Sequence, residues 1–417
     1  MLHSTMFLVL ACGFGFFMAW GVGANDVANA MGTSVGSKAL SIRNAIIIAA
    51  IFEFAGAFFA GGAVTNTISG GITDISYFVN QPELLVYGML ASLLAAGIWL
   101  LVATYFGWPV STSHSIVGAI VGFAAVGVGI DAVQWGKVGF IVMSWVVSPL
   151  IGLILAYGLF MSVQYLIFNA QEPFRAAKRY VPVYIFLTAF LFLMVTFVKG
   201  LKYVGLNLSF MESTMISMTV SVFITLIGCF FLNRIKADPA AEREFHFANV
   251  EKIFAVLMAF TACAMSFAHG SNDVANAVGP LAAVINIVQN NGAIGVTSVA
   301  EPWILFLGAA GIVCGLVMYG HKVIVTIGSG ITELTPSRGF AATLAGAVTM
   351  ILASGTGLPI SSTHTLVGAI LGVGLARGIG AINLNMVTTI FTSWIVTLPA
   401  GALLSILTFY VFKYSFG

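Results

Sequence analysis

The chain carries two copies of one polar octapeptide within apolar sequence, GANDVANA at Gly23–Ala30 and GSNDVANA at Gly270–Ala277. Each copy contains one aspartate and two asparagines. A charged residue at the centre of a membrane helix costs about 2.5–3.5 kcal/mol on insertion scales, so packing alone explains Asp26 and Asp273 poorly. Carboxylate and amide oxygens together are hard ligands that suit a small cation rather than a soft metal. The motif therefore predicts a cation site.

Helical spacing places the polar groups of each copy on one broad face, because residues three and four positions apart are neighbours on a helix. The small residues between them let another backbone approach closely. A second interpretation is that these groups only hold helices together by hydrogen bonds, and the matched duplication argues against it. We predict as cation ligands the six residues Asn25, Asp26, Asn29, Asn272, Asp273 and Asn276.

A second duplicated motif reads PVSTSH at Pro109–His114 and PISSTH at Pro359–His364, with no Lys or Arg in either copy. Proline followed by hydroxyl residues is typical of a capped helix N-terminus, whose free N–H groups and positive dipole end bind anions. We predict as oxyanion ligands Ser111, Thr112, Ser113, Ser361, Ser362 and Thr363. If the anion carries a proton that it can donate, we predict that Asp26 and Asp273 also contact it.

The carboxylates of one motif and the anion of the other would repel each other in a low-dielectric cavity. Cations placed between them remove this conflict, so that each ligand binds better when the other is present, and such coupling is reciprocal. Mutual dependence of this kind is what a symporter requires. The two motifs together predict a secondary transporter that moves an oxyanion with a cation.

Four further ionisable residues lie in apolar segments. Glu53 has no counterpart in the second half of the chain, and we interpret it as either a further cation or proton site or a hydrogen-bonded helix contact. His114 and His364 follow the hydroxyl clusters and are interpreted as structural histidines bonded to backbone, with an anion-ligand or proton-carrier role as the alternative. His269 precedes the second aspartate motif and carries no prediction.

Composition sets the class of protein. Of 417 residues, 59% are hydrophobic and 7% are charged, whereas a soluble domain has about 25% charged residues. Runs of roughly 20 apolar residues, long enough to span a bilayer, recur throughout, so we predict an all-α polytopic protein embedded in the lipid bilayer of the plasma (inner) membrane. The net charge of +2 and the lack of a basic tract argue against a nucleic-acid partner. The four cysteines lack metal-type spacing, and we expect no cofactor apart from co-transported ions.

About twelve transmembrane segments are expected, several of them interrupted by Gly or Pro. They lie near 5–22, 42–62, 84–106, 110–130, 138–167, 181–198, 215–232, 250–269, 303–325, 340–355, 359–376 and 388–412. With the N-terminus outside, twelve Lys and Arg residues fall on the cytoplasmic side and four fall outside, namely Lys137, Lys199, Lys202 and Lys413. Basic residues favour the cytoplasmic side, so both termini are predicted to be extracytoplasmic.

The two motif pairs recur in the same order, at offsets of 247 and 250 residues, so the two halves are copies of each other. On the segment count, the first aspartate motif ends the first helix, its copy ends the eighth, and the copies point in opposite directions. A single re-entrant segment, for which 109–130 is the candidate, would reverse this parity. Inverted repeats with broken or re-entrant helices are typical of secondary transporters. We divide the chain into a first inverted repeat (1–167), a central segment with two helices (168–249) and a second inverted repeat (250–417).

An enzyme is the first alternative, since a serine with an adjacent base is the arrangement of a hydrolase. Neighbouring residues on a helix point about 100° apart, so Ser113 and His114 would not face each other, and the second copy has Thr363 in place of the serine. We therefore do not expect an enzyme. An anion channel is the second and less favoured alternative, because pores also use hydroxyl and carboxylate rings.

The chain resembles the inorganic phosphate transporter family over nearly its full length. The resemblance rests on the duplicated G-x-N-D-V-A-N-A motif and the duplicated P-x-S/T-S/T-x-H motif quoted above. It implies uptake of inorganic phosphate coupled to sodium, or in some bacterial members to protons with metal–phosphate as substrate, and an inverted-repeat fold with both ends outside. On matching positions it implies that Asn25, Asp26, Asn272 and Asp273 hold sodium beside phosphate, whose oxygens face the six hydroxyls.

Some alternatives stay open at this point. The coupling ion could be a proton and the anion could be sulfate, because a hydroxyl cage alone does not distinguish two tetrahedral oxyanions. Direct contact between a carboxylate and the anion would favour phosphate, since sulfate has no proton to donate at neutral pH. The centre of the chain, 169–249, lacks the long hydrophilic domain of larger family members. A homo-oligomer is compatible with the sequence, which does not fix the oligomeric state.

Overall fold

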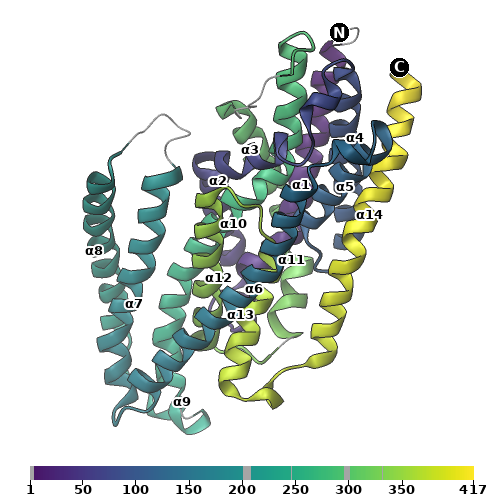
Figure 1. Cartoon of the computed structure of the whole chain (residues 1–417). Helices are drawn as coiled ribbons and strands as arrows, with labels where there is room; N and C mark the ends of the chain where they lie inside the picture. The colour runs from purple at the N-terminus through teal and green to yellow at the C-terminus, as the bar shows by residue number, and fades with distance from the viewer. Residues whose placement is uncertain (1–3, 201–207, 246, 295–300, 331) are drawn as a thin grey trace.

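The structure, a computed structural model, describes residues 4–200, 208–245, 247–294, 301–330 and 332–417 (Figure 1). These parts are helical apart from short connections and one isolated β-bridge, which confirms the predicted all-α class. The first half contains α1 (Ser4–Gly36), α2 (Ile42–Ala60), α3 (Gly62–Gly70), α4 (Pro82–Tyr105), α5 (Thr112–Gly127) and α6 (Trp135–Val163). The centre contains α7 (Pro173–Val195), α8 (Phe210–Arg234) and α9 (Pro239–Glu244). The second half contains α10 (Ala248–Gln289), α11 (Pro302–Gly330), α12 (Pro336–Thr356), α13 (Ser362–Arg377) and α14 (Leu384–Phe416).

Ten helices in the described residues are long and apolar enough to cross a membrane. The two other predicted crossings, 110–130 and 359–376, form α5 and α13, which have 16 residues each. At 1.5 Å per residue such a helix is about 24 Å long, shorter than the roughly 30 Å hydrocarbon core. These two segments are therefore the short, broken helices that the inverted-repeat class predicts.

Each short helix is the second arm of a hairpin. The chain enters and leaves the first hairpin, α4–α5, at one place, because Thr73 before it and Val133 after it form a β-bridge. The second hairpin, α12–α13, is closed in the same way, since Thr332 Oγ1 donates to the carbonyl of Ala381 at 2.8 Å. A hairpin with two arms returns the chain to its starting side, so the parity is not reversed, as it would be by a single re-entrant segment.

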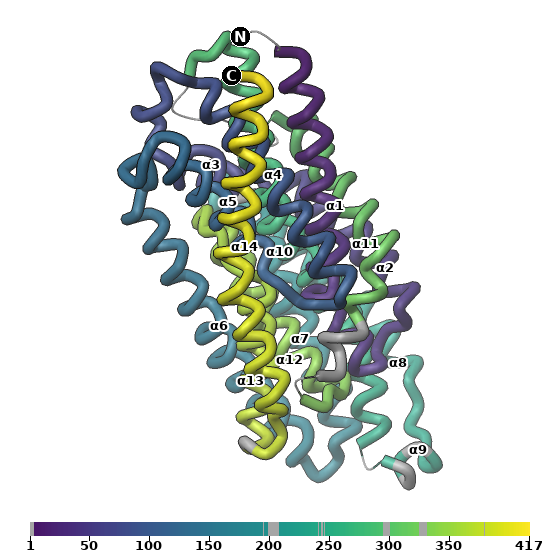
Figure 2. The backbone as a smooth tube through the Cα atoms, turned by 90° about the vertical axis from the view of Figure 1, so that its right-hand side faces the viewer, coloured from purple at the N-terminus to yellow at the C-terminus, as the bar shows by residue number. Residues whose placement is uncertain are grey.

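The two halves run in opposite directions. In Figures 1 and 2, α1 descends from the end that carries both termini, whereas α10 rises toward that end from the neighbourhood of α9. The α4–α5 hairpin lies in the half nearer the termini, and the α12–α13 hairpin lies in the opposite half (Figure 2). The halves exchange partners, because α5 packs on α14, α13 packs on α6, α1 packs on α11 and α10 packs on α2. The predicted inverted arrangement is therefore confirmed.

The two helices with aspartate motifs are longer than predicted. The first was expected to end with its motif and instead continues to Gly36, and the second continues to Gln289, so both motifs lie within a helix. The expectation that they end helices one and eight is wrong. The physical reason is that other helices surround both motifs and offer partners for the side chains, so the backbone keeps its own helical hydrogen bonds.

Local signals set several helix boundaries. Pro82, Pro173 and Pro336 each occupy the first turn of a helix, where a missing N–H costs no helical hydrogen bond. A capping box formed by Ser209 and Glu212 starts α8, with Ser209 Oγ accepting from the Glu212 N–H at 3.2 Å.

Helices α7 and α8 form a pair at the side of the bundle, where α7 packs on α8 and α10 (Figure 1). The polar sequence around 169–180 and 233–249 includes the start of α7 and all of α9, and it lies at the end opposite the termini. The assignment of that end to the cytoplasm and the division at 167 and 249 stay predictions. The side chains of Lys199, Lys202 and Arg243, which entered the charge comparison, lie outside the described residues.

Candidate functional site

The two aspartate motifs lie fully inside the bundle. Each of their aspartates and asparagines is at most 1% exposed. A Cβ added to Gly23 would lie 1.9 Å from the Ile312 carbonyl oxygen, and one added to Gly270 would lie 2.2 Å from the Glu53 carbonyl oxygen. The glycines of the motifs thus let α11 and α2 pack backbone to backbone against α1 and α10, which is the close approach that the small residues predict.

The two hydroxyl motifs lie at helix starts, as predicted. Ser111 is the N-cap of α5 and its Oγ accepts from the His114 N–H at 3.3 Å. Ser361 is the N-cap of α13 and accepts from the His364 N–H at the same distance. Both helix N-termini are buried, so their free N–H groups and their positive dipole ends face a low-dielectric interior.

Each aspartate motif reaches the hydroxyls of the other half. Asn29 Nδ2 donates to Thr363 Oγ1 at 2.8 Å and to Ser362 Oγ at 3.3 Å. In the mirrored arrangement, Asn276 Nδ2 donates to Thr112 Oγ1 at 3.0 Å and to Ser113 Oγ at 3.3 Å. The predicted cation and anion residues are thus interleaved in one site that requires both halves.

The same site contains buried oxygen atoms without a hydrogen-bond donor. Asp26 Oδ1 accepts from Asn29 at 3.2 Å, and Asp273 Oδ2 accepts from Ser362 Oγ at 2.7 Å. Their other carboxylate oxygens have no partner, and the side-chain oxygens of three asparagines also lack one, namely Asn29, Asn272 and Asn276. Buried polar atoms are normally satisfied, so five unpaired acceptors in one place are what a site for cations requires.

Asn25 and Asn272 hold the hairpin loops. Asn25 Nδ2 donates to Thr104 Oγ1 and to the Trp108 carbonyl, both at 3.1 Å, and its Oδ1 accepts from the Val110 N–H at 3.4 Å. Asn272 Nδ2 donates to Ser354 Oγ at 3.1 Å and to the Leu358 carbonyl at 3.3 Å. Both residues therefore fix the loops that lead into the hydroxyl motifs, in addition to their predicted role.

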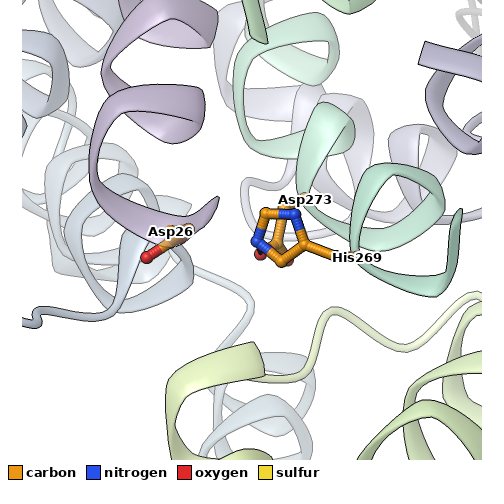
Figure 3. Close-up of side chains that lie close together, drawn as sticks. All are labelled: Asp26, His269 and Asp273. Carbon is orange, nitrogen blue, oxygen red and sulfur yellow. Dashed lines mark ion pairs between the residues drawn. The ribbon is translucent and has the colours of Figure 1, made fainter. Parts of the chain in front are cut away.

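His269 belongs to the site, although we made no prediction for it from the sequence. Its Nε2 lies 2.9 Å from Asp273 Oδ2 and its Nδ1 lies 3.3 Å from Glu53 Oε1, with all three side chains fully buried. Figure 3 shows His269 and Asp273 on α10 facing Asp26 on α1, and ligand atoms of these three residues lie within 4.8 Å of one another. The available signal was spacing, because His269 precedes Asp273 by one helical turn.

Only one of the two aspartates that the inverted repeat relates has such a chain of ionisable groups behind it. The close backbone contacts at Gly23 and Gly270 make Ile312 the counterpart of Glu53, and the sequence offset makes Val22 the counterpart of His269. Val22 and Ile312 are both fully buried apolar residues. Asp273 therefore has an imidazole and a second carboxylate behind it, whereas Asp26 is backed by hydrocarbon.

His114 and His364 lie behind the hydroxyls. Their Nδ1 atoms lie 3.3 Å and 3.1 Å from the carbonyl oxygens of Trp394 and Trp145, and each ring packs on a tryptophan. This supports their interpretation as structural histidines. Ser113 Oγ donates to the Ile360 carbonyl at 3.0 Å rather than to a histidine, so the arrangement that a hydrolase would need is not formed by these residues.

Comparison with known proteins identifies the family to which the chain belongs. Residues 22–405 match the phosphate transporter family. The chain belongs to the phosphate transporter family. It is 55% identical to a Haemophilus influenzae protein named "Putative phosphate permease", over 96% of this chain and 95% of that protein. It is 43% identical to the chloroplastic inorganic phosphate transporter 2-1 of Arabidopsis thaliana, over 96% of this chain and 71% of that protein.

A solved structure shares the fold. A chain described as "The sodium-dependent phosphate transporter" superposes with a TM-score of 0.90 at 39% identity, over 98% of this chain and 99% of that one. Together with the ten helices of spanning length, the comparisons make this chain an integral membrane protein of a phosphate transporter family.

Proposed function

We propose that the transporter imports inorganic phosphate by symport with sodium. The observation that carries the proposal is the set of five unpaired buried oxygens beside two buried helix N-termini. In this reading phosphate lies between the starts of α5 and α13, with the six hydroxyl residues of Ser111–Ser113 and Ser361–Thr363 around it. The name of the similar solved structure adds support for sodium as the coupling ion.

Sodium ions would lie between the anion and the aspartates. Asp26, Asn29, Asp273 and Asn276 each offer a buried oxygen without a donor toward this region, and Asn272 offers another. A cation there neutralises the repulsion between phosphate and the carboxylates and satisfies acceptors that hydrogen bonds leave free. Phosphate and sodium thus bind together better than either alone, which is the reciprocal coupling of a symporter.

A proton-coupled phosphate or metal–phosphate carrier is the second candidate, and one observation favours it. Glu53, His269 and Asp273 form a continuous buried chain of ionisable groups that ends at the site. In the sodium reading, these groups hold Asp273 in place, whereas in the proton reading they carry the coupling ion. Sulfate transport and an anion channel are not favoured by any contact in the site.

The orientation follows from the charge distribution. Both termini lie at one end of the molecule, and the segments around 169–180 and 233–249, which contain six of the sixteen Lys and Arg residues, lie at the other. By the excess of basic residues on the cytoplasmic side, the termini would face outward in the plasma (inner) membrane. Cysteine labelling of a tagged terminus in intact cells tests this, and protection of the tag in intact cells would reverse the orientation.

Radiolabelled phosphate uptake into proteoliposomes tests the function. An inward sodium gradient is compared with equal potassium at two external pH values, with sulfate as a competing anion. Uptake that requires sodium and survives loss of the proton gradient is the expected result. Uptake that ignores sodium and follows the proton gradient would transfer the function to the second candidate, and phosphate equilibration without accumulation would indicate a channel.

A further inference from the structure

A cavity lies beside the candidate site, and the loop between α4 and α5 separates the two. Its volume is about 600 Å³, and it lies between the end of α4, the loop that follows it and the first half of α14. It is lined by Trp99, Trp108, Val110, Asn385, Thr388, Thr389, Thr392, Ser393 and Val396. Helix α14 starts at the end of the molecule opposite the termini (Figure 2), so the cavity is on that side of the site.

The wall formed by α14 is a polar stripe. Its five polar residues follow one another at spacings of three, one, three and one, which places them on one helix face. The hydroxyls of Thr388, Thr389 and Thr392 each donate to a carbonyl one turn back in their own helix, so their oxygens stay available as acceptors. Most other exposed residues of α14 are apolar, among them Ile395 at 75% and Leu403 at 63% exposure. A helix face of this kind suits water rather than lipid.

The inverted repeat offers an internal comparison. Ser144 and Trp145 of α6 correspond to Ser393 and Trp394 of α14, and both tryptophan carbonyls face a histidine of the opposite half. On this alignment, the five polar positions of α14 correspond to Gly136, Gly139, Phe140, Met143 and Ser144 in α6. Four of the five polar side chains thus have no polar counterpart, so the stripe is a property of one side of the molecule.

The loop between cavity and site contacts both. Ser393 Oγ, in the cavity wall, donates to the Pro109 carbonyl at 3.2 Å. On the other side of the loop, Asn25 binds the Trp108 carbonyl and the Val110 N–H, and Thr363 Oγ1 donates to the Val110 carbonyl at 3.1 Å. Gly107 starts the loop with φ of 68°, a conformation that favours glycine.

One further group lining the cavity lacks a partner. The indole N–H of Trp99 is buried and has no hydrogen-bond acceptor.

We propose that this cavity is a water-filled vestibule through which phosphate leaves the site toward the end opposite the termini, and that the loop of Gly107–Ser111 is the partition that must move. The inference rests on the proposed phosphate transport. It assigns α14 residues to the path of the anion, and it predicts that the vestibule is wet although it lies between helices of membrane-spanning length.

Cysteine accessibility tests the water content. In a variant whose four native cysteines are replaced by alanine, Thr392→Cys is reacted with a membrane-impermeant anionic methanethiosulfonate added to either face of proteoliposomes. We expect modification from the face opposite the termini, at least tenfold faster than for the control Ile395→Cys, an exposed position that does not line the cavity. Equal and slow modification of both cysteines would show a lipid-filled groove and overturn the proposal.

A variant that fills the cavity distinguishes a role in the path of the anion from a role in the binding site. Thr389→Trp fills the cavity, and we expect phosphate uptake to fall at least tenfold while inorganic phosphate with sodium still raises the apparent Tm as in the unchanged protein. Leu403→Trp, at an exposed position further along α14 and outside the cavity lining, is the matched control and should transport normally. Full uptake by Thr389→Trp would overturn the vestibule, and loss of phosphate binding in this variant would place Thr389 in the site instead. If the unchanged protein neither binds nor transports phosphate, the proposed function itself fails.

Discussion

The buried Glu53–His269 pair gives a prediction whose magnitude follows from the structure. Both side chains are fully buried, and Nδ1 of His269 lies 3.3 Å from Oε1 of Glu53. His269→Val would remove this neighbour, and no other described residue donates a hydrogen bond to either oxygen of the Glu53 carboxylate. Removing one partner of a buried ion pair costs about 3–5 kcal/mol, whereas replacing both by apolar residues is often neutral. Glu53→Ile should likewise destabilise the protein on its own.

The other half of the molecule supplies the double variant. Because Val22 and Ile312 occupy the equivalent buried positions, Glu53→Ile combined with His269→Val copies an arrangement that this fold already accepts. We expect each single variant to lower the apparent Tm by roughly 5–10 °C, and the double variant to recover most of that loss. Its phosphate uptake should still fall at least tenfold, since Asp273 loses the imidazole that holds it.

The assay is a double-mutant cycle in detergent, with the apparent Tm from tryptophan fluorescence and uptake measured in proteoliposomes. Recovery of stability without recovery of uptake is the result that the geometry predicts. Strictly additive losses of Tm in the double variant would refute the reasoning, because they would mean that the two groups do not stabilise each other.

Three further predictions concern the site and its packing. Asp26→Asn and Asp273→Asn should each insert normally and lose sodium-driven uptake, and near-normal uptake by both would remove them from the site. Asn276→Ala deletes two hydrogen bonds to the other half, and at about 1–3 kcal/mol for an unsatisfied buried group the apparent phosphate affinity in a titration should weaken roughly tenfold or more. Gly23→Ala should prevent folding, judged by yield and monodispersity, because its Cβ would overlap a carbonyl oxygen of α11, whereas Gly13→Ala, with nothing within 4 Å, should be harmless.

Much of the molecule was predictable because its signals are local. Apolar runs identify spanning helices, and proline followed by hydroxyl residues identifies the starts of α5 and α13. The motif duplication, at nearly constant offset, predicts two related halves, and the number of segments between the copies predicts their opposite directions. Each of these inferences uses residues within one helix or the order of segments along the chain, which the sequence contains directly.

The ends of α1 and α10 were not predictable in this way. A run of Gly, Asn and Asp lowers helix propensity, so the sequence suggests that both helices stop at their motifs. In the structure the helices continue, because tertiary packing overrides a weak local preference. The inclusion of His269 was missed for a related reason, since its partner Glu53 lies on α2, more than 200 residues away along the chain.

The membrane class, the duplicated motifs and the chemical types of the ligands could be read from the amino-acid sequence, because these depend on composition and short-range spacing. Which ligands meet depends on the packing of helices that are distant in the chain. Asn29 binds Ser362, 333 residues further along, and the oxygens left without donors are defined by what every neighbouring helix supplies. Pairings of this kind arise when two inverted halves pack together, and no local pattern records which side chains that packing brings into contact.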